Sequence, residues 1–179
     1  MTTASVNQRI QEVTDPASRR ALYELFEAVR SELAELKTDS VINAPTLSTG
    51  STAENVATTA FQYRIDGVTY TKAAVTAGTA LGITDTINTG AATGTFYGGF
   101  LAQINAAGTI SFVAAAADQV YTSEAAAEVA IRATAATAGS VIIGYFVVGA
   151  TADADWVAGT DDLTAASDCT SVTYWSACA

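Results

Sequence analysis

Histidine is absent from this 179-residue chain, and basic residues of any kind are scarce. Without histidine, the chain lacks the commonest general base, the Ser-His and Cys-His nucleophile arrangements and the commonest zinc ligand. Its glycines match no phosphate-binding or dinucleotide-binding spacing. We therefore expect no catalytic residue, no cofactor and no bound metal, and we predict that the protein is not an enzyme.

Positive charge is the second shortage. Lysine and arginine number eight against eighteen acidic residues, so the formal net charge is −10. After residue 40 the basic residues are Arg64, Lys72 and Arg132, against eleven acidic ones. Nucleic acids and anionic membranes are bound largely through Lys and Arg. The composition therefore predicts neither a nucleic-acid partner nor a membrane partner.

Long hydrophobic runs are missing too. The longest, residues 141–150, contains Gly144 and is too short to cross a bilayer. The amino-terminal segment 1–12 lacks the apolar core of a signal peptide, so we expect no signal peptide.

Cysteine is limited to Cys169 and Cys178, whose spacing matches no zinc signature. A disulfide between them and two free thiols are both open alternatives.

Acidic residues gather near the carboxyl end, where a calcium loop or a catalytic acid pair could be sought. The spacing lacks the regular ligand positions and terminal Glu of an EF-hand. Aspartates that bond to their own turn backbone are the favoured interpretation. The residues concerned are Asp153, Asp155, Asp161, Asp162 and Asp168.

A repeating apolar pattern is present in the charge-rich segment 1–40. Asp15 and Pro16 predict a helix start, and helix-forming residues continue to about Lys37. Within this helix the apolar residues repeat at spacings of four and three, which is typical of a coiled coil. We call this set the apolar stripe: Leu22, Val29 and Leu36 at heptad position d, and Phe26 and Leu33 at position a.

The residues beside the apolar stripe bear on the number of helices. Bulky residues at position a, together with Leu25 at position g, favour a coiled coil of three or more helices over one of two. Glu32 at g and Lys37 at the next e are spaced for a salt bridge between parallel chains. We expect a homotrimer, with an amphipathic helix folded back on the rest of the chain as the alternative.

The remaining sequence predicts a mainly β fold. We expect residues 1–40 to form an arm and coiled-coil stalk, 41–57 a linker with a flexible polar connector over 47–54, and 58–179 an antiparallel sandwich with one short helix. Expected features are a hairpin turning at Asp66-Gly67, a second hairpin turning through residues 105–108, a helix capped by Ser123 and a buried strand over 140–148. Residues 73–95 are expected to be loops with a short strand near 81–87.

Aromatic residues of the β region could provide a stacking platform for sugars. The candidates are Tyr63, Tyr70, Tyr97, Tyr121, Tyr174, Trp156 and Trp175. Because aromatic side chains in a β-rich domain mostly pack in its core or between subunits, we expect core or interface positions for most of them.

Four stretches resemble virion structural proteins of tailed bacteriophages: YRIDGVTYTKAA, DTINTGAATGTFYGGFLAQINAAGTISF, QVYTSEAAAEVAI and IGYFVVGATADADWVAGTDDLTAASD. The likeness covers residues 60–168. It implies a non-enzymatic, trimeric head fibre or capsid decoration protein located in the virion, with capsid or tail proteins as partners. Residues 1–40 would then anchor it to the particle. The alternatives are a tail-fibre component that contacts a host-surface glycan, and a secreted bacterial adhesin or carbohydrate-binding module.

Overall fold

The structure is a computed structural model that describes residues 10–11, 15–36, 38–87, 94–151, 155–164 and 169–177. The chain forms two compact units, residues 1–38 and residues 39–179. The boundary therefore falls at residue 38, close to the end expected for the helical segment. We call the second unit the head. It is mainly antiparallel β, as predicted.

The first unit contains helix α2 (Pro16–Leu36), which begins as the sequence predicts. The Asp15 carboxylate accepts a 2.8 Å hydrogen bond from the Ser18 N–H, and the Arg19 N–H donates to the Asp15 carbonyl at 3.0 Å. The hydrogen bonds from Ser18, side chain first and then backbone, hold the pKa of Asp15 below its usual value. Asp15 is thus the N-cap, and Pro16 occupies the first helical position, where no N–H is needed.

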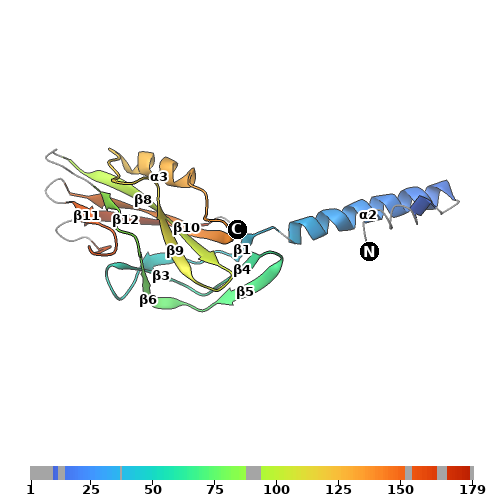
Figure 1. Ribbon diagram of the computed structural model, residues 1–179, viewed down its shortest axis with the longest axis horizontal. Coiled ribbons are helices and arrows are strands. Elements are labelled where there is room, and N and C mark those ends of the chain that lie inside the picture. The colour runs from blue at the N-terminus through green and yellow to red at the C-terminus, as the bar shows by residue number, and fades with distance from the viewer. Residues whose placement is uncertain are drawn as a thin grey trace. The chain divides into compact units, whose positions relative to one another are not determined.

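A four-stranded antiparallel sheet is the centre of the head (Figure 1). Its order is β12–β10–β8–β9, with bounds Cys169–Ser176, Ser140–Ala150, Phe96–Asn105 and Ile110–Ala114. Strands β8 and β9 form the predicted second hairpin, in which the Gly108 N–H donates to the Asn105 carbonyl at 2.9 Å. Strand β10 contains the predicted buried run 140–148 and extends it to Ala150.

Strand β10 contains a bulge that keeps its apolar residues on the inner face. Ile142 pairs with Gln103 and Gly144 with Ala102, so Ile143 is the extra residue. An extra residue shifts the side-chain alternation by one position. Val141 and Ile143 therefore belong to the buried cluster in the first part of the strand. After the bulge, its members are Phe146, Val148 and Ala150.

Among the described residues, three smaller antiparallel sheets accompany this one. Strands β1 (Ser40–Asn43), β4 (Phe61–Ile65) and β5 (Val68–Lys72) form one, and β2 (Leu47–Thr49), β3 (Asn55–Thr58) and β6 (Val75–Ala80) form another. Strands β7 (Thr86–Ile87) and β11 (Trp156–Val157) pair with each other. The β4–β5 hairpin turns at Asp66 and Gly67, both with positive φ, as expected for a type I′ turn.

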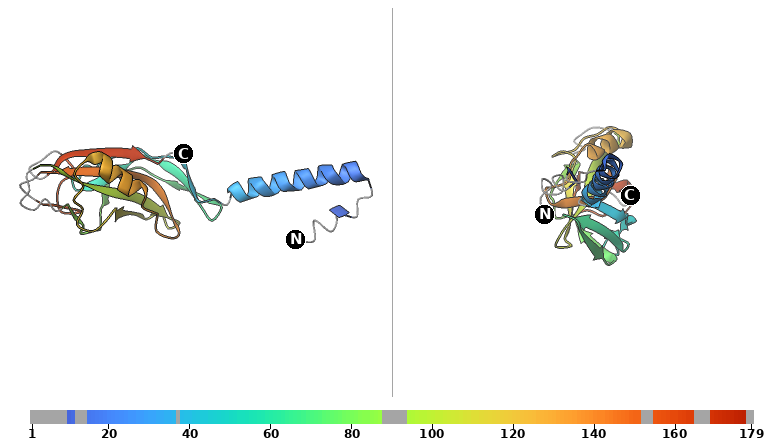
Figure 2. Two further views of the ribbon diagram at one scale, coloured as in Figure 1. Left: turned by 90° about the horizontal axis from the view of Figure 1, so that it is seen from above. Right: turned by 90° about the vertical axis from the view of Figure 1, so that its right-hand side faces the viewer.

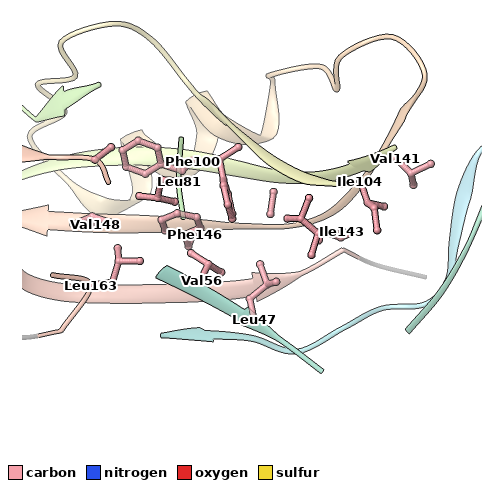
Figure 3. Packing of buried hydrophobic residues seen from close by; sticks show 14 of the residues in the cluster. Leu47, Val56, Leu81, Phe100, Ile104, Val141, Ile143, Phe146, Val148 and Leu163 are labelled. Atoms are coloured by element: carbon pink, nitrogen blue, oxygen red, sulfur yellow. The ribbon is translucent and has the colours of Figure 1, made fainter. Parts of the chain in front are cut away.

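The main hydrophobic core lies between the four-stranded sheet and the smaller sheets (Figure 3). Leu47 and Val56 come from the β2–β3–β6 sheet, and they pack toward Phe146 and Ile143 of β10. Trp156 is fully buried, and its ring lies 5.5 Å from that of Phe100. The core thus combines large aromatic side chains with Leu, Ile and Val, and small residues are a minority in it.

Helix α3 (Glu124–Arg132) covers the outer face of β8 and β10 (Figure 2). The Ser123 hydroxyl accepts from the Ala126 N–H at 3.2 Å, which confirms the predicted N-cap. The helix approaches β8 closely at Gly99. A Cβ there would lie 2.8 Å from the Ala127 carbonyl oxygen and 2.9 Å from the Ile131 Cβ. Glycine is therefore required at position 99 for this packing.

One expectation for the β region is wrong and another is met only in part. Residues 41–57 are not a linker, because they contain β2 and most of β1 and β3, and Leu47 and Val56 are core residues. In the segment 73–95, the short strand expected near residues 81–87 is limited to β7, and the six-residue strand β6 was not expected. Both segments are rich in Ser, Thr, Gly and Ala, so local composition favoured loops, whereas pairing with distant strands determines the structure.

Candidate self-association surface

The apolar stripe of α2 is exposed in the monomer. The exposed fraction is 40% for Leu22, 46% for Val29 and 53% for Leu33, and 61% for the neighbouring Leu25. Phe26 is half-buried. A surface helix normally turns such residues toward a core. Because these four side chains keep so much of their surface in water, this face of α2 is a candidate surface for self-association.

Charged residues flank the apolar stripe with pairs inside the helix. Arg20 Nε lies 2.9 Å from Glu24 Oε1, and Arg30 lies 3.7 Å from Glu27. These pairs are exposed, and each contributes at most a few tenths of a kcal/mol, about 0.2–0.5. Glu32 is exposed. Lys37 and the side chain of Leu36 lie outside the described residues, so the interchain pair remains a prediction.

The cysteine alternatives also remain open. Cys169 is buried in the core, where its thiol lies 3.6 Å from the Ser171 carbonyl oxygen. Burial raises the pKa of this thiol. Cys178 lies outside the described residues, so whether the two cysteines are bonded stays a prediction.

One member of the aspartate cluster has the expected turn role. The Asp161 carboxylate accepts a 2.6 Å hydrogen bond from the Val157 N–H, and the Trp156 indole donates to the Asp162 carbonyl at 3.1 Å. Asp153 and Asp168 lie outside the described residues. Within the described part of the chain, no three acidic or cysteine side chains are grouped as metal ligands.

Most of the candidate sugar-stacking residues have partners inside the head. Trp156 and Tyr63 are buried, which excludes them as exposed platforms. Tyr70 stacks on Tyr63 with a centroid distance of 5.3 Å. The Tyr174 hydroxyl lies 2.9 Å from Thr49 Oγ1. The others, Tyr97, Tyr121 and Trp175, are half-buried.

Trp175 belongs to a stack of three side chains on the outer face of the sheet. Its ring lies 5.3 Å from that of Tyr145, at an interplanar angle of 20°. The Arg132 guanidinium lies over the Tyr145 ring, 4.2 Å from the centroid. Its Nε also contacts Glu128 at 2.8 Å. Arg132 is therefore held in place by a cation–π contact and an ion pair.

A hollow of about 570 Å³ adjoins this stack. It is lined by the carboxyl end of α3, the start of β1, β10, and Ala177. Sequence patterns did not predict this hollow, because its lining residues are distant in sequence. The one signal available was Arg132, which is the single basic residue after Lys72, and it does not indicate a hollow by itself.

Comparisons with protein-family models, curated proteins and solved structures find no match for this chain. Within the described residues, no helix combines the length and the hydropathy needed to span a bilayer.

Proposed function

We propose that the protein is a non-enzymatic structural component of a tailed-phage virion, a trimeric head fibre or capsid decoration protein. The exposed apolar stripe of α2 is the observation that carries this proposal. An apolar face on a water-exposed helix needs a partner, and a repeat of four and three residues suits identical helices side by side. The resemblance of residues 60–168 to virion proteins supplies the biological setting.

Self-association would also explain how α2 is stabilised. The helix has 21 residues, about 32 Å at the usual rise, and a single helix of this length is marginal in water. Its a positions hold Phe26 and Leu33, and Leu25 widens the apolar surface, so three helices fit better than two. Residues 1–40 would then anchor the trimer to the particle, and the head would face solvent.

A second candidate is receptor binding as a tail-fibre component. The observation that favours it is Trp175, which lies on β12 at one edge of the described sheet with Tyr145 stacked behind it. A half-exposed indole is a suitable surface for the apolar face of a sugar ring. Binding to a glycan array that disappears in Trp175→Ala, while the fold is unchanged, would favour this role.

Two measurements test the leading proposal. Light scattering on the full chain at micromolar concentration should give the mass of a trimer, whereas a monomer would contradict the stalk. A mass-spectrometric inventory of purified phage particles from the source should contain the chain in the capsid fraction. Its absence from particles would contradict a virion role even if the chain is trimeric.

A further inference from the structure

Two features lie at the end of the head where the chain enters from α2. Asp39 is the first residue of the head unit, and it lines the hollow. The Asp39 carboxylate also accepts a 2.7 Å hydrogen bond from the Asp66 N–H, which ties the turn of the β4–β5 hairpin to the same place. The hollow and the hairpin tip (residues 66–68) are therefore both adjacent to the point of entry.

The hairpin tip presents an exposed apolar side chain, Val68, next to an exposed carboxylate, Asp66. Val68 is 52% exposed although it is a β-branched apolar residue, and Asp66 is exposed next to it in the turn. The φ values of 52° at Asp66 and 78° at Gly67 define a tight turn. At the other end of the hairpin, Lys72 Nζ donates to the Gly108 carbonyl at 2.8 Å. The tip is thus presented on an anchored hairpin.

The hollow offers the complementary surface. It is lined by the apolar residues Leu101, Ile131, Val141 and Ile142, and also by Arg132. The contacts of Arg132 with Glu128 and Tyr145 fix the position of this charge before any partner arrives. An apolar side chain with an adjacent carboxylate fits a hollow lined by apolar residues and by Arg132, because a guanidinium has five N–H donors and the contact with Glu128 uses its Nε.

We propose that the hairpin tip of one copy docks in the hollow of the next copy around a trimer, with Val68 in the hollow and Asp66 facing Arg132. This inference rests on the proposed trimer. Asp39 follows Leu36 by only three positions, so their Cα atoms lie within about 11 Å of each other. When three α2 helices pack together, the three Asp39 residues are held close to one another by the chain, which keeps neighbouring heads at a high local concentration.

The arrangement is a ring in which each copy donates one tip and accepts another. Such a contact between unlike surfaces can close after three copies. Asp39 also lines the hollow, so like-charge repulsion disfavours a docked carboxylate beside it and favours the position beside Arg132. The proposed occupant is a second copy of this chain, and a small ligand is the alternative that the test decides.

Disulfide trapping in the full chain tests the contact. Val68→Cys combined with Ala136→Cys, in a Cys178→Ser background, places one thiol at the tip and one at the hollow. Mild oxidation should convert most of the protein to covalent trimer. The matched control is Val129→Cys with Ala136→Cys, since Val129 is 70% exposed on the outer face of α3 and should give little covalent trimer.

The outcomes separate this inference from the proposed function. If light scattering gives the mass of a trimer but oxidation yields no more covalent trimer than in the control, the docking is wrong and the proposed trimer still stands. A monomer overturns both. As a second readout, a bulky maleimide should label Ala136→Cys at least tenfold more slowly than the same cysteine in a Val68→Asp background. Equal rates would show that no copy covers the hollow, which is then open to a small ligand.

Discussion

At the scale of single residues, Tyr174 connects the two layers of the head through its hydroxyl. Thr49 Oγ1 lies 2.9 Å from that hydroxyl and 2.8 Å from the Leu163 carbonyl, to which it donates. Burial raises the pKa of Tyr174 to about 12, partly offset by the hydrogen bond with Thr49. The phenol is therefore kept neutral in the folded protein at pH values where a free tyrosine ionises.

The first prediction is an alkaline loss of stability that depends on Tyr174. An unfolded tyrosine ionises near pH 10, so between pH 10 and about 12 the unfolded chain releases a proton that the folded head retains. The free energy of unfolding should be unaffected by this group below pH 10 and fall as pH rises through that window. With an allowance for partial exposure, the loss is on the order of 2 kcal/mol.

Urea denaturation at pH 8, 10 and 11.5 measures this effect. Tyr174→Phe should reduce the fall between pH 10 and 11.5, and Tyr121→Phe serves as the matched control. Some pH dependence should persist in both variants because burial also raises the pKa of Tyr63. If Tyr174→Phe and the control lose stability equally over this window, the proton linkage to Tyr174 is wrong.

Residues with local roles were the ones that sequence could predict. Asp15, Pro16, Ser123 and the Asp66-Gly67 pair act on their own backbone, so their neighbours in sequence suffice to interpret them. Gly99 is different. Its role depends on Ala127 and Ile131 of α3, which come much later in the chain, and no local pattern reveals that approach.

At the scale of elements, the two units differ in the number and the setting of the basic residues, after which trypsin cleaves. The helical unit contains Arg9, Arg19, Arg20, Arg30 and Lys37. The head has three basic residues, each held in regular structure. Arg64 lies in the central strand of its sheet, Lys72 bonds to the Gly108 carbonyl, and Arg132 pairs with Glu128.

The second prediction is that limited trypsin digestion leaves a stable carboxyl-terminal fragment beginning near residue 38. Short helices open locally at low free-energy cost, whereas cleavage inside the head requires a larger opening. Intact-mass measurement over a digestion time course identifies the fragment. Early cleavage after Arg132 would instead show that α3 is loosely held on β8 and β10.

Element boundaries show where prediction from sequence failed. The strongly periodic helix α2 was predicted almost to the residue, because capping and periodicity are local signals. Strands β2 and β6 were missed, since their small and hydroxylated residues are common in loops too. Leu47 packs against β10, which is far away in the sequence, and only that distant contact identifies its segment as part of the core.

At the scale of the whole molecule, the proposed assembly uses one face of α2. The third prediction concerns Val29→Asp with Leu33→Asp, which places up to six carboxylates in the apolar interface of a trimer. Burying unpaired charge is strongly unfavourable, so the helices should separate. Sedimentation should show trimer affinity at least tenfold weaker, and circular dichroism should show less helix.

A matched pair of substitutions separates this effect from added charge alone. Ala28→Asp with Ala34→Asp adds the same charge at exposed positions of α2 outside the apolar stripe. That variant should remain trimeric. If both double variants associate as strongly as the unchanged chain, the apolar stripe is not the interface, and an interface confined to the head would have to explain any trimer.

The hollow has a consequence for the connectivity of the head. Asp39 and Ala177 both line it, so the chain enters and leaves the head at the same end (Figure 1). Termini that are near each other permit circular permutation. A short linker could join them, and a new start could be opened in a surface turn such as that between β8 and β9. Attaching α2 at this new start would join the helix to the opposite end of the head while keeping the same core.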